Sequence, residues 1–485
     1  MRFISSTTLI LALLISTLAL PPRSYLAGQT PPASRPNLQA IPIPSPAPLP
    51  PPTVKIDKYR APAARIIGAA LTSDKAYARL AHLTDHIGHR LSGSKGLEQA
   101  IAWALAEMRR DGLDNVRGEK VMVPHWVRGR ESLELTSPVT RELMMLGLGN
   151  SVGTPPEGIS AAAMVVRNFD ELERLGERVR GKIVVYNFPF TNYGAAVQYR
   201  QNGASRAARY GAVAALVRSV TAVSLQTPHT GAMAYAEEQP KIPTAAITIE
   251  GAELLQRLHD RGDRPVLRLK MDAKFLPDAE SANVIAELKG SEKPDEVVVV
   301  SGHYDSWDVG QGAHDDGGGC IIAWEAARLL KELGLRPRRT IRVVLYTNEE
   351  NGLRGGTAYR DAHRSEISKH ILAIESDSGT YQPVGFGLAA AATPQARANV
   401  QEIAKLLSGI RADRIAANGG GADIGAIMRE GVLGASLDVD SSHYFDIHHT
   451  PADTLDKIDP QNLALCVATM AVMAYTVADM PQSLN

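Results

Sequence analysis

Cysteine is scarce in this sequence: Cys320 and Cys466 are the only two among 485 residues. Neither is accompanied by the histidine and asparagine pattern that supports a cysteine nucleophile, which argues against thiol catalysis. Both lie in apolar helical patterns, so we expect two buried thiols that pack as small hydrophobic groups. A disulfide between them is the alternative, if the compartment is oxidising and the fold brings them together.

Net charge is also absent, because 52 lysine and arginine residues balance 52 aspartate and glutamate residues. Such a chain has no overall field to draw it onto nucleic acid or an anionic membrane surface, and we expect neither partner. The glycine run 317–319 follows two aspartates and lacks the lysine of a phosphate-binding loop. A G-x-S-x-G serine hydrolase signature is missing as well. A local site therefore has to choose the substrate.

The N-terminal apolar run, residues 9–20, is too short to span a bilayer, since it offers about 12 residues where ~20 are needed. Arg2 precedes the run and the small residue Ala27 follows it, which is typical of an export signal. We expect a signal peptide over residues 1–27, a mature protein that is secreted or periplasmic, and no membrane contact after removal of the signal. A short internal hydrophobic anchor is the alternative.

Proline is abundant in the next segment, over residues 31–53. A chain of this composition lacks backbone donors and favours extended polyproline II. We therefore expect a proline-rich linker over residues 28–55, which acts as a semi-rigid spacer or lies on the surface as an arm.

The pattern of apolar residues in the remaining chain changes twice. Residues 60–111 have helical apolar spacing, with an expected stop at Gly112. Short strands such as 181–186 and 212–217, with a helix near 203–211, replace this pattern. We expect one domain in two parts, residues 56–125 and 279–485, which a β-rich insert over residues 126–278 interrupts.

After Glu280, apolar strands alternate with helices. Strands are expected at residues 296–301, 341–347 and 371–374, and a helix at 320–333. This alternation predicts an α/β fold whose mostly parallel, open sheet is covered by helices on both faces.

Histidine and carboxylate residues follow these strands and indicate a metal site. In open α/β sheets, ligands bind beyond the carboxyl ends of the strands. A set of nitrogen and oxygen ligands without cysteine suits zinc or a similar divalent ion placed for hydrolysis. The candidate ligands are His303, Asp315, Glu350, Asp377 and His449.

Two further carboxylates extend this site. Asp305, two residues after His303, is expected to accept the second imidazole N–H and so fix the tautomer. Glu349 and Glu350 point different ways at a strand end, so one can hold metal while the other takes a proton from the attacking water. Asp315 precedes a tight glycine turn and is placed to bridge two ions.

These residues closely resemble family M28 of co-catalytic zinc peptidases. The likeness runs from about residue 57 to the C-terminus and includes several motifs that match one subfamily. They are Arg90-Leu91-Ser92-Gly93-Ser94-Lys95, Lys241-Ile242-Pro243-Thr244-Ala245, Ser306-Trp307-Asp308-Val309-Gly310-Gln311-Gly312, Leu335-Arg336-Pro337 and Val477-Ala478-Asp479-Met480.

The resemblance implies two Zn²⁺ per chain: one held by His303 and Asp377, the other by Glu350 and His449, with Asp315 bridging both. It implies that Glu349 is the general base, that the peptide bond after Asp315 is cis, and that the insert is a protease-associated domain. It also implies a short peptide substrate, such as a dipeptide, and a homodimer.

Two positions depart from the wider family. His448 stands where many relatives have a tyrosine that polarises the substrate carbonyl, and it either donates that hydrogen bond or braces the loop. Asp423 lacks the histidine that follows the matching aspartate in several aminopeptidases, and we expect it either behind the metal ligands or in contact with a substrate terminus.

Three functions therefore compete. A dizinc exopeptidase agrees best with five ligands. A metal-dependent amidohydrolase or a glutaminyl cyclase-like enzyme is the first alternative, and a non-catalytic binding protein on the same fold is the second. No arginine cluster marks a carboxylate pocket and no acidic group marks an amine pocket, so the sequence leaves open which peptide terminus is recognised.

Overall fold

The computed structural model describes residues 48–484. The expected signal peptide and the linker before residue 48 lie outside the described residues. The end of the linker packs on the protein: the main-chain N–H groups of Thr53 and Val54 donate to Asn399 Oδ1 at 2.8 and 3.3 Å. Asn399 lies in helix α9 (Pro394–Ala404).

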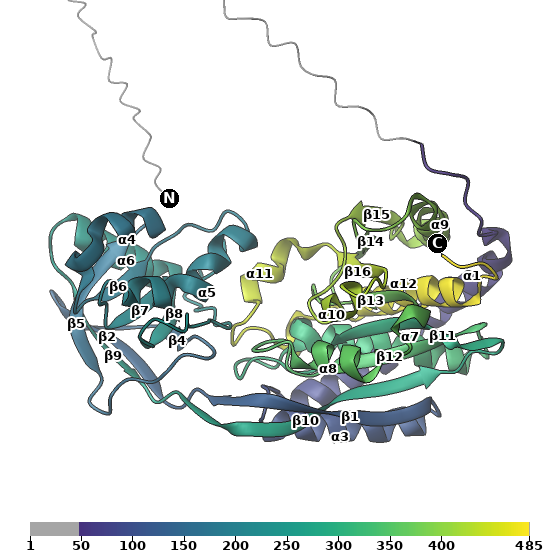
Figure 1. Ribbon diagram of the computed structural model, residues 1–485, viewed down its shortest axis with the longest axis horizontal. Helices are drawn as coiled ribbons and strands as arrows, with labels where there is room; N and C mark the ends of the chain where they lie inside the picture. Colours follow the sequence, from purple (N-terminus) through teal and green to yellow (C-terminus); the bar gives the residue numbers. More distant parts are fainter. Residues whose placement is uncertain (1–47, 485) are drawn as a thin grey trace, which may run out of the picture. The chain divides into compact units, whose positions relative to one another are not determined.

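Two eight-stranded sheets organise the described chain (Figure 1). The first sheet holds the expected strands of the last third of the sequence. Its strands, in spatial order, are β1 (Asp114–Val127), β10 (Lys274–Leu288), β12 (Arg339–Tyr346), β11 (Lys293–His303), β13 (His370–Glu375), β16 (Gly434–Val439), β14 (Pro383–Leu388) and β15 (Arg414–Ala417).

The predicted α/β class is confirmed, but the first sheet is mixed. Its four central strands, β12, β11, β13 and β16, run parallel to one another. β10 pairs antiparallel with both β12 and β1, and β14 pairs antiparallel with β16. β14 and β15 also pair parallel, so the expected parallel arrangement holds at the centre and at this edge, whereas the remaining pairs are antiparallel.

Helices cover both faces of this sheet, and β11 shows how the sequence arranges this. Val298 and Val300 pack into the larger core cluster, whereas Val297 and Val299 point to the opposite side, as the period of two in a strand requires. On the first face lie α1 (Arg60–Leu71), α2 (Lys75–His82), α3 (Lys95–Arg110), α7 (Gly318–Glu332), α9 and α12 (Pro460–Asp479). On the second face lie α8 (Arg354–Ala362) and α10 (Gly425–Met428).

Helix α12 is the most apolar of the long helices that the structure describes. By length and composition it could cross a membrane, yet 83% of its apolar window is buried inside the protein. Cys466 in α12 and Cys320 in α7 are both buried free thiols. The expectation of two buried thiols is thus confirmed, and no disulfide joins them.

The second sheet is formed by residues 131–271. Its strands, in spatial order, are β3 (Arg141–Leu143), β2 (Glu131–Ser137), β9 (Val266–Met271), β5 (Ile159–Val166), β6 (Ile183–Tyr186), β7 (Ala214–Arg218), β8 (Thr244–Ile247) and β4 (Met145–Gly147). The chain enters through β1 and leaves through β10, which lie side by side, with Trp126 opposite Phe275. This antiparallel ladder ties the inserted segment to the first sheet.

Three α-helices accompany the second sheet, so this segment contains more helix than the expected β-rich insert. α6 (Ile249–Asp260) packs on one face, and α4 (Phe169–Leu175) and α5 (Tyr193–Ala208) pack on the other. α5 begins ten residues earlier than the helix expected near residue 203, because Asn192 caps it: Asn192 Oδ1 accepts the N–H of Ala195 at 2.9 Å. This early start brings Tyr193 and Arg200 into the helix.

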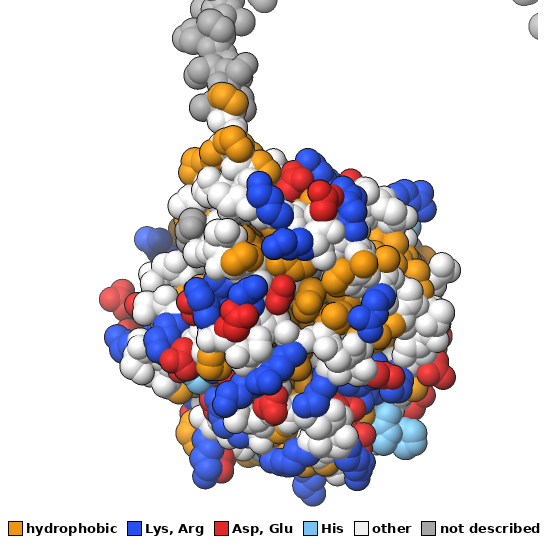
Figure 2. Space-filling view, turned by 90° about the vertical axis from the view of Figure 1, so that its right-hand side faces the viewer, with side chains coloured by type: hydrophobic (Ala, Val, Ile, Leu, Met, Phe, Trp, Pro, Cys, Tyr) orange, Lys and Arg blue, Asp and Glu red, His pale blue; other side chains and the backbone are white. Residues whose placement is uncertain are grey.

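Acidic and basic side chains are interspersed on the face shown in Figure 2, with hydrophobic side chains between them. No large area of one charge sign appears on this face, in keeping with the balanced composition.

Candidate metal centre

The candidate ligands gather at one edge of the first sheet. His303 ends β11, Glu349 and Glu350 follow β12, and Asp377 follows β13. Because β11, β12 and β13 are parallel neighbours, their carboxyl ends meet at the same edge.

The remaining two candidates come from loops over that edge. Asp315 lies in the turn before α7, and His449 follows the short helix α11 (Tyr444–Ile447). His303, Asp315, Glu350 and His449 are buried, and Asp377 is partly exposed.

The Asp315 carboxylate lies between the two histidines. Its Oδ1 is 3.1 Å from His303 Nε2, and its Oδ2 is 3.1 Å from His449 Nε2. A second carboxylate backs each histidine: Asp377 Oδ1 lies 3.4 Å from His303 Nε2, and Glu350 Oε2 lies 3.1 Å from His449 Nε2. The structure thus brings all five candidates together around Asp315.

Two buried oxygens in this cluster make no hydrogen bond. Asp315 Oδ2 has none, although it lies close to His449 Nε2, and Glu350 Oε1 has none either. Unpaired buried carboxylate oxygens are costly unless they are protonated or coordinate a cation. The donor set therefore fits divalent metal ions.

The electrostatics of the cluster lead to the same conclusion. Burial and the neighbouring Asp315 raise the pKa of Glu350 to about 7. Burial opposes a charge on His449, but the carboxylates of Glu350 and Asp315 raise its pKa to about 10. Bound divalent ions favour deprotonated ligands, so a cation here would stabilise the carboxylates that burial disfavours.

The position of Glu349 is fixed through its backbone by Asp305. Asp305 Oδ1 accepts the main-chain N–H of Glu349 at 3.0 Å, and Oδ2 accepts that of Glu350 at 3.2 Å. The imidazole of His303 contacts Asp305 through the backbone instead: Nδ1 lies 3.0 Å from the Asp305 carbonyl oxygen and 3.8 Å from Oδ1. Asp305 thus accepts from the second imidazole nitrogen of His303, as expected, but through its carbonyl oxygen, because its carboxylate holds the Glu349 turn.

Backbone hydrogen bonds also hold the Asp315 turn. Asp453 accepts the main-chain N–H groups of His314 and Asp315 at 2.8 and 3.1 Å, and Asp316 Oδ2 accepts that of His303 at 2.9 Å. The peptide bond between Asp315 and Asp316 is cis, as the family resemblance implied.

His448 and Asp423, the two positions that depart from the wider family, differ in their access to the site. The His448 ring stacks on His449 with centroids 3.5 Å apart, and its Nε2 lies 3.5 Å from Asp315 Oδ2. Burial and the neighbouring His449 hold the pKa of His448 well below its usual value, so the ring is neutral and retains one N–H donor. Asp423 is fully buried, and neither of its carboxylate oxygens has a hydrogen-bond partner. It does not line the cavity described next.

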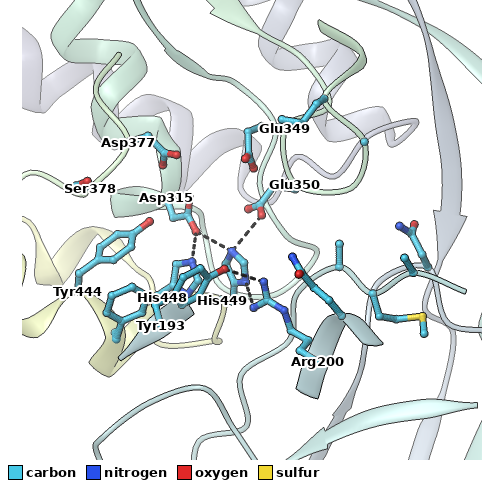
Figure 3. A pocket seen from close by; sticks show the side chains of 18 of the residues that line it. Tyr193, Arg200, Asp315, Glu349, Glu350, Asp377, Ser378, Tyr444, His448 and His449 are labelled. Carbon is cyan, nitrogen blue, oxygen red and sulfur yellow. Dashed lines mark hydrogen bonds and ion pairs between the residues drawn. The ribbon is translucent and has the colours of Figure 1, made fainter. Parts of the chain in front are cut away.

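A cavity of about 740 Å³ opens over the cluster. Asp315, Glu349, Glu350 and Asp377 point into the same space in Figure 3. The opposite wall carries side chains of the inserted segment, including Tyr193 and Arg200 from α5.

Sequence reasoning missed these insert residues. Arg200 Nη2 donates to Tyr193 Oη at 2.8 Å, and Arg200 Nη1 lies 3.4 Å from His449 Nδ1. The i, i+7 spacing of Tyr193 and Arg200 places them on one helix face, but only the packing of α5 against the loop of His449 shows that this face lines the cavity.

Comparisons with known proteins identify the family of this chain. The model of peptidase family M28 matches residues 283–474. Carboxypeptidase Q of Bos taurus is 50% identical over 411 residues, covering 85% of this chain and 87% of that protein. Carboxypeptidase Q of Mus musculus is 48% identical over 433 residues, covering 89% of this chain and 92% of that protein.

Solved structures show the same fold. The crystal structure of a peptidase M28 precursor from Shewanella amazonensis superposes with a TM-score of 0.85 at 36% identity, covering 89% of this chain and 99% of that one. A zinc aminopeptidase from Bacillus subtilis superposes with a TM-score of 0.65 at 20% identity, covering 84% of this chain and 95% of that one. At that identity the second likeness shows the fold alone.

Proposed function

Because this chain belongs to peptidase family M28 and is a metallopeptidase, we propose that it is a dizinc exopeptidase that hydrolyses dipeptides or short peptides. The observation that carries this proposal is the placement of Asp315 between His303 and His449, at 3.1 Å from each. Each histidine has its own second carboxylate, so the site offers two matching half-sites.

We assign His303 and Asp377 to one zinc ion and Glu350 and His449 to the other, with Asp315 shared. When bound, the ions would supply Lewis acidity for the substrate carbonyl and the attacking water. His303 and His449 each turn Nε2 toward the shared carboxylate, while Nδ1 lies 3.0 Å from the carbonyl oxygen of Asp305 and 3.3 Å from that of Thr230, respectively. These contacts favour a proton on Nδ1 and leave Nε2 free as a ligand atom.

Glu349 is the general base in this proposal. Its side chain lines the cavity beside Glu350, and its backbone is fixed by Asp305. Burial, together with Asp377 and Glu350, raises the pKa of Glu349 well above its usual value. A carboxylate at this position can take a proton from a nearby water and pass it to the leaving amine.

We propose that residues 56–125 and 279–485 form the catalytic domain and that residues 126–278 form a protease-associated domain, supported by the separate sheet over residues 131–271. We further propose an exported protein, on the strength of the apolar run over residues 9–20, and a homodimer.

Hydrolysis of dipeptides by chelator-treated protein, assayed before and after zinc is restored, tests the proposed function. We expect activity to vanish with the chelator and to return with zinc. Full activity after complete metal removal, or no dipeptide hydrolysis by the zinc-loaded protein, would contradict it.

A further inference from the structure

The candidate ligand His449 has an unfavourable backbone conformation. Its φ is +61°, in the left-handed region that residues with a Cβ atom rarely adopt. It lies on a loop after the short helix α11 rather than in a strand or a long helix. Contacts with the surrounding protein therefore have to hold the imidazole of His449 in the direction of Asp315 and Glu350.

Thr230 of the inserted segment holds this residue through two hydrogen bonds. The Thr230 N–H donates to the His449 carbonyl oxygen at 3.0 Å, and the Thr230 carbonyl oxygen lies 3.3 Å from His449 Nδ1. The first contact fixes the main chain of the ligand and the second fixes the rotation of its ring. With Nδ1 held in this way, Nε2 faces Asp315 and Glu350, at 3.1 Å from an oxygen of each.

Thr230 is in turn anchored within the inserted segment. It is fully buried. Its hydroxyl group donates to the Gly147 carbonyl oxygen at 2.8 Å and accepts from Arg128 Nη2 at 3.3 Å. The next residue adds a main-chain bond, because the Gly149 N–H donates to the Gly231 carbonyl oxygen at 3.0 Å. Gly147 ends β4, so the position of Thr230 follows that of the second sheet.

His303, the histidine of the other half-site, is held by groups close to it in the sequence. It ends β11, its main-chain N–H donates to Asp316 Oδ2 at 2.9 Å, and its Nδ1 lies 3.0 Å from the Asp305 carbonyl oxygen. Both partners belong to the second part of the proposed catalytic domain. The two half-sites thus differ in which part of the chain positions their histidine.

We propose that the inserted segment controls, through Thr230, the zinc affinity of the half-site formed by Glu350 and His449. This inference rests on the proposed function. Outer hydrogen bonds to a ligating histidine change metal affinity by about 10- to 100-fold. Because the φ of His449 is unfavourable, loss of the Thr230 contacts releases this residue to conformations in which Nε2 no longer faces Asp315. Movement of the insert away from the His449 loop then weakens binding of one ion, while His303 keeps its position.

Zinc binding by metal-free protein, measured in a chelator buffer, tests this coupling. Thr230→Val keeps the branched shape of the side chain but removes the hydroxyl group that anchors it to Gly147. The wild-type protein is expected to bind two ions. In Thr230→Val we expect one binding step at the wild-type affinity and the other weakened by about 10-fold or more. Thr230→Ser, which keeps the hydroxyl group, is expected to restore wild-type binding.

Thr248 provides a matched control within the same segment. It is buried, and its hydroxyl group accepts the Gly251 N–H at 3.0 Å at the start of α6, the helix that packs on the second sheet. Thr248→Val therefore also removes a buried hydroxyl group from the insert, and both zinc-binding steps are expected to remain unchanged.

A further variant assigns the weakened step. Glu350→Gln removes a ligand of the His449 half-site and leaves His303, Asp315 and Asp377 in place. Addition of Thr230→Val to this protein is expected to leave the remaining zinc-binding step unchanged, because His303 does not depend on the insert.

The wild-type protein allows a second measurement that needs no variant to fold. Coupling between two sites is reciprocal, so zinc has to stabilise the segment around Thr230 if this segment stabilises zinc. Amide hydrogen exchange of residues 229–233 is expected to be about tenfold slower or more in zinc-loaded than in metal-free protein, whereas exchange in α6 changes little.

The outcomes separate the two proposals. Equal weakening of both steps in Thr230→Val, or no weakening, would overturn the role of Thr230, as would unchanged exchange of residues 229–233 on zinc binding. A Thr230→Ser or Thr248→Val protein that binds zinc as weakly as Thr230→Val would also overturn it, since general loosening of the insert would then be the cause. Fewer than two zinc ions on the wild-type protein contradicts the proposed function itself.

Discussion

The carboxylate of Asp305 accepts the main-chain N–H of Glu349 at 3.0 Å, so a buried acid sets the position of the candidate general base without touching its side chain. The second oxygen of Asp305 does the same for Glu350 at 3.2 Å. One residue thereby aligns a proposed ligand and a proposed base at the end of β12.

Replacement of Asp305 by asparagine tests this alignment. An amide can accept only through its single oxygen, and its NH₂ group would face the N–H of Glu349 or Glu350. We expect kcat to fall by about tenfold or more, because small displacements of catalytic groups strongly reduce the rate. Zinc content should remain near that of the wild type. Steady-state kinetics and metal analysis measure both. Asp295→Asn, at an exposed residue, is the control; an unchanged kcat in Asp305→Asn would show that Glu349 does not depend on this contact.

Arg90 gives a prediction on stability. This fully buried arginine donates to the main-chain carbonyls of Gly88, Tyr304, Gln311 and Gly312 at 2.8 to 3.0 Å. Arg90→Met would leave these acceptors unpaired, and we expect a loss of about 3 kcal/mol in the free energy of unfolding. Denaturant unfolding measures it, with the exposed Arg65→Met as control. A loss below about 1 kcal/mol would mean that water replaces the guanidinium.

His370 gives a prediction on pH, at a distance from the metal centre. Burial lowers the pKa of His370 to about 4, while its Nε2 contacts Tyr359 Oη at 2.9 Å. The unfolded chain, with an ordinary histidine pKa of ~6.5, therefore binds a proton between about pH 6.5 and 4 that the folded chain does not. The contribution of neutral His370 to the free energy of unfolding is therefore fully present above pH 6.5 and is lost as the pH drops toward 4.

Urea unfolding at pH 7.5 and pH 5 checks this linkage. Relative to the wild type, His370→Asn is expected to lose about 2 kcal/mol less stability on acidification, because the variant lacks the titrating group. His86→Asn, at an exposed histidine, should behave as the wild type does. Equal acid sensitivity of the wild type and His370→Asn would show that His370 is not held neutral.

Much of the site was predictable because it follows from topology. Strands 296–301, 341–347 and 371–374 stand out as β-branched runs, and parallel neighbours bring the residues after them to one edge. His303, Glu350 and Asp377 could be grouped on that basis. Asp315 and His449 lie on loops, and the resemblance to family M28 placed them where strand patterns could not.

The contacts that depend on side-chain direction were not predictable in the same way. Asp305 is two residues from His303, and only the coordinates reveal that its carbonyl faces the imidazole while its carboxylate faces the next strand's turn. Arg200 is separated from His449 by 249 residues. The helix start set by Asn192 and the glycine at residue 194 made the first half of α5, which includes Arg200, hard to recognise from the sequence.

Zinc content and turnover of Glu349→Gln, measured beside the wild type on the same substrate, test the proposed centre most directly. We expect about two zinc ions per chain in both proteins, since Asp315, His303, Asp377, Glu350 and His449 are untouched, and turnover at least ~100-fold lower in the variant. One zinc ion per chain in the wild type, or turnover of Glu349→Gln at the wild-type rate, would contradict a shared Asp315 with Glu349 as the base.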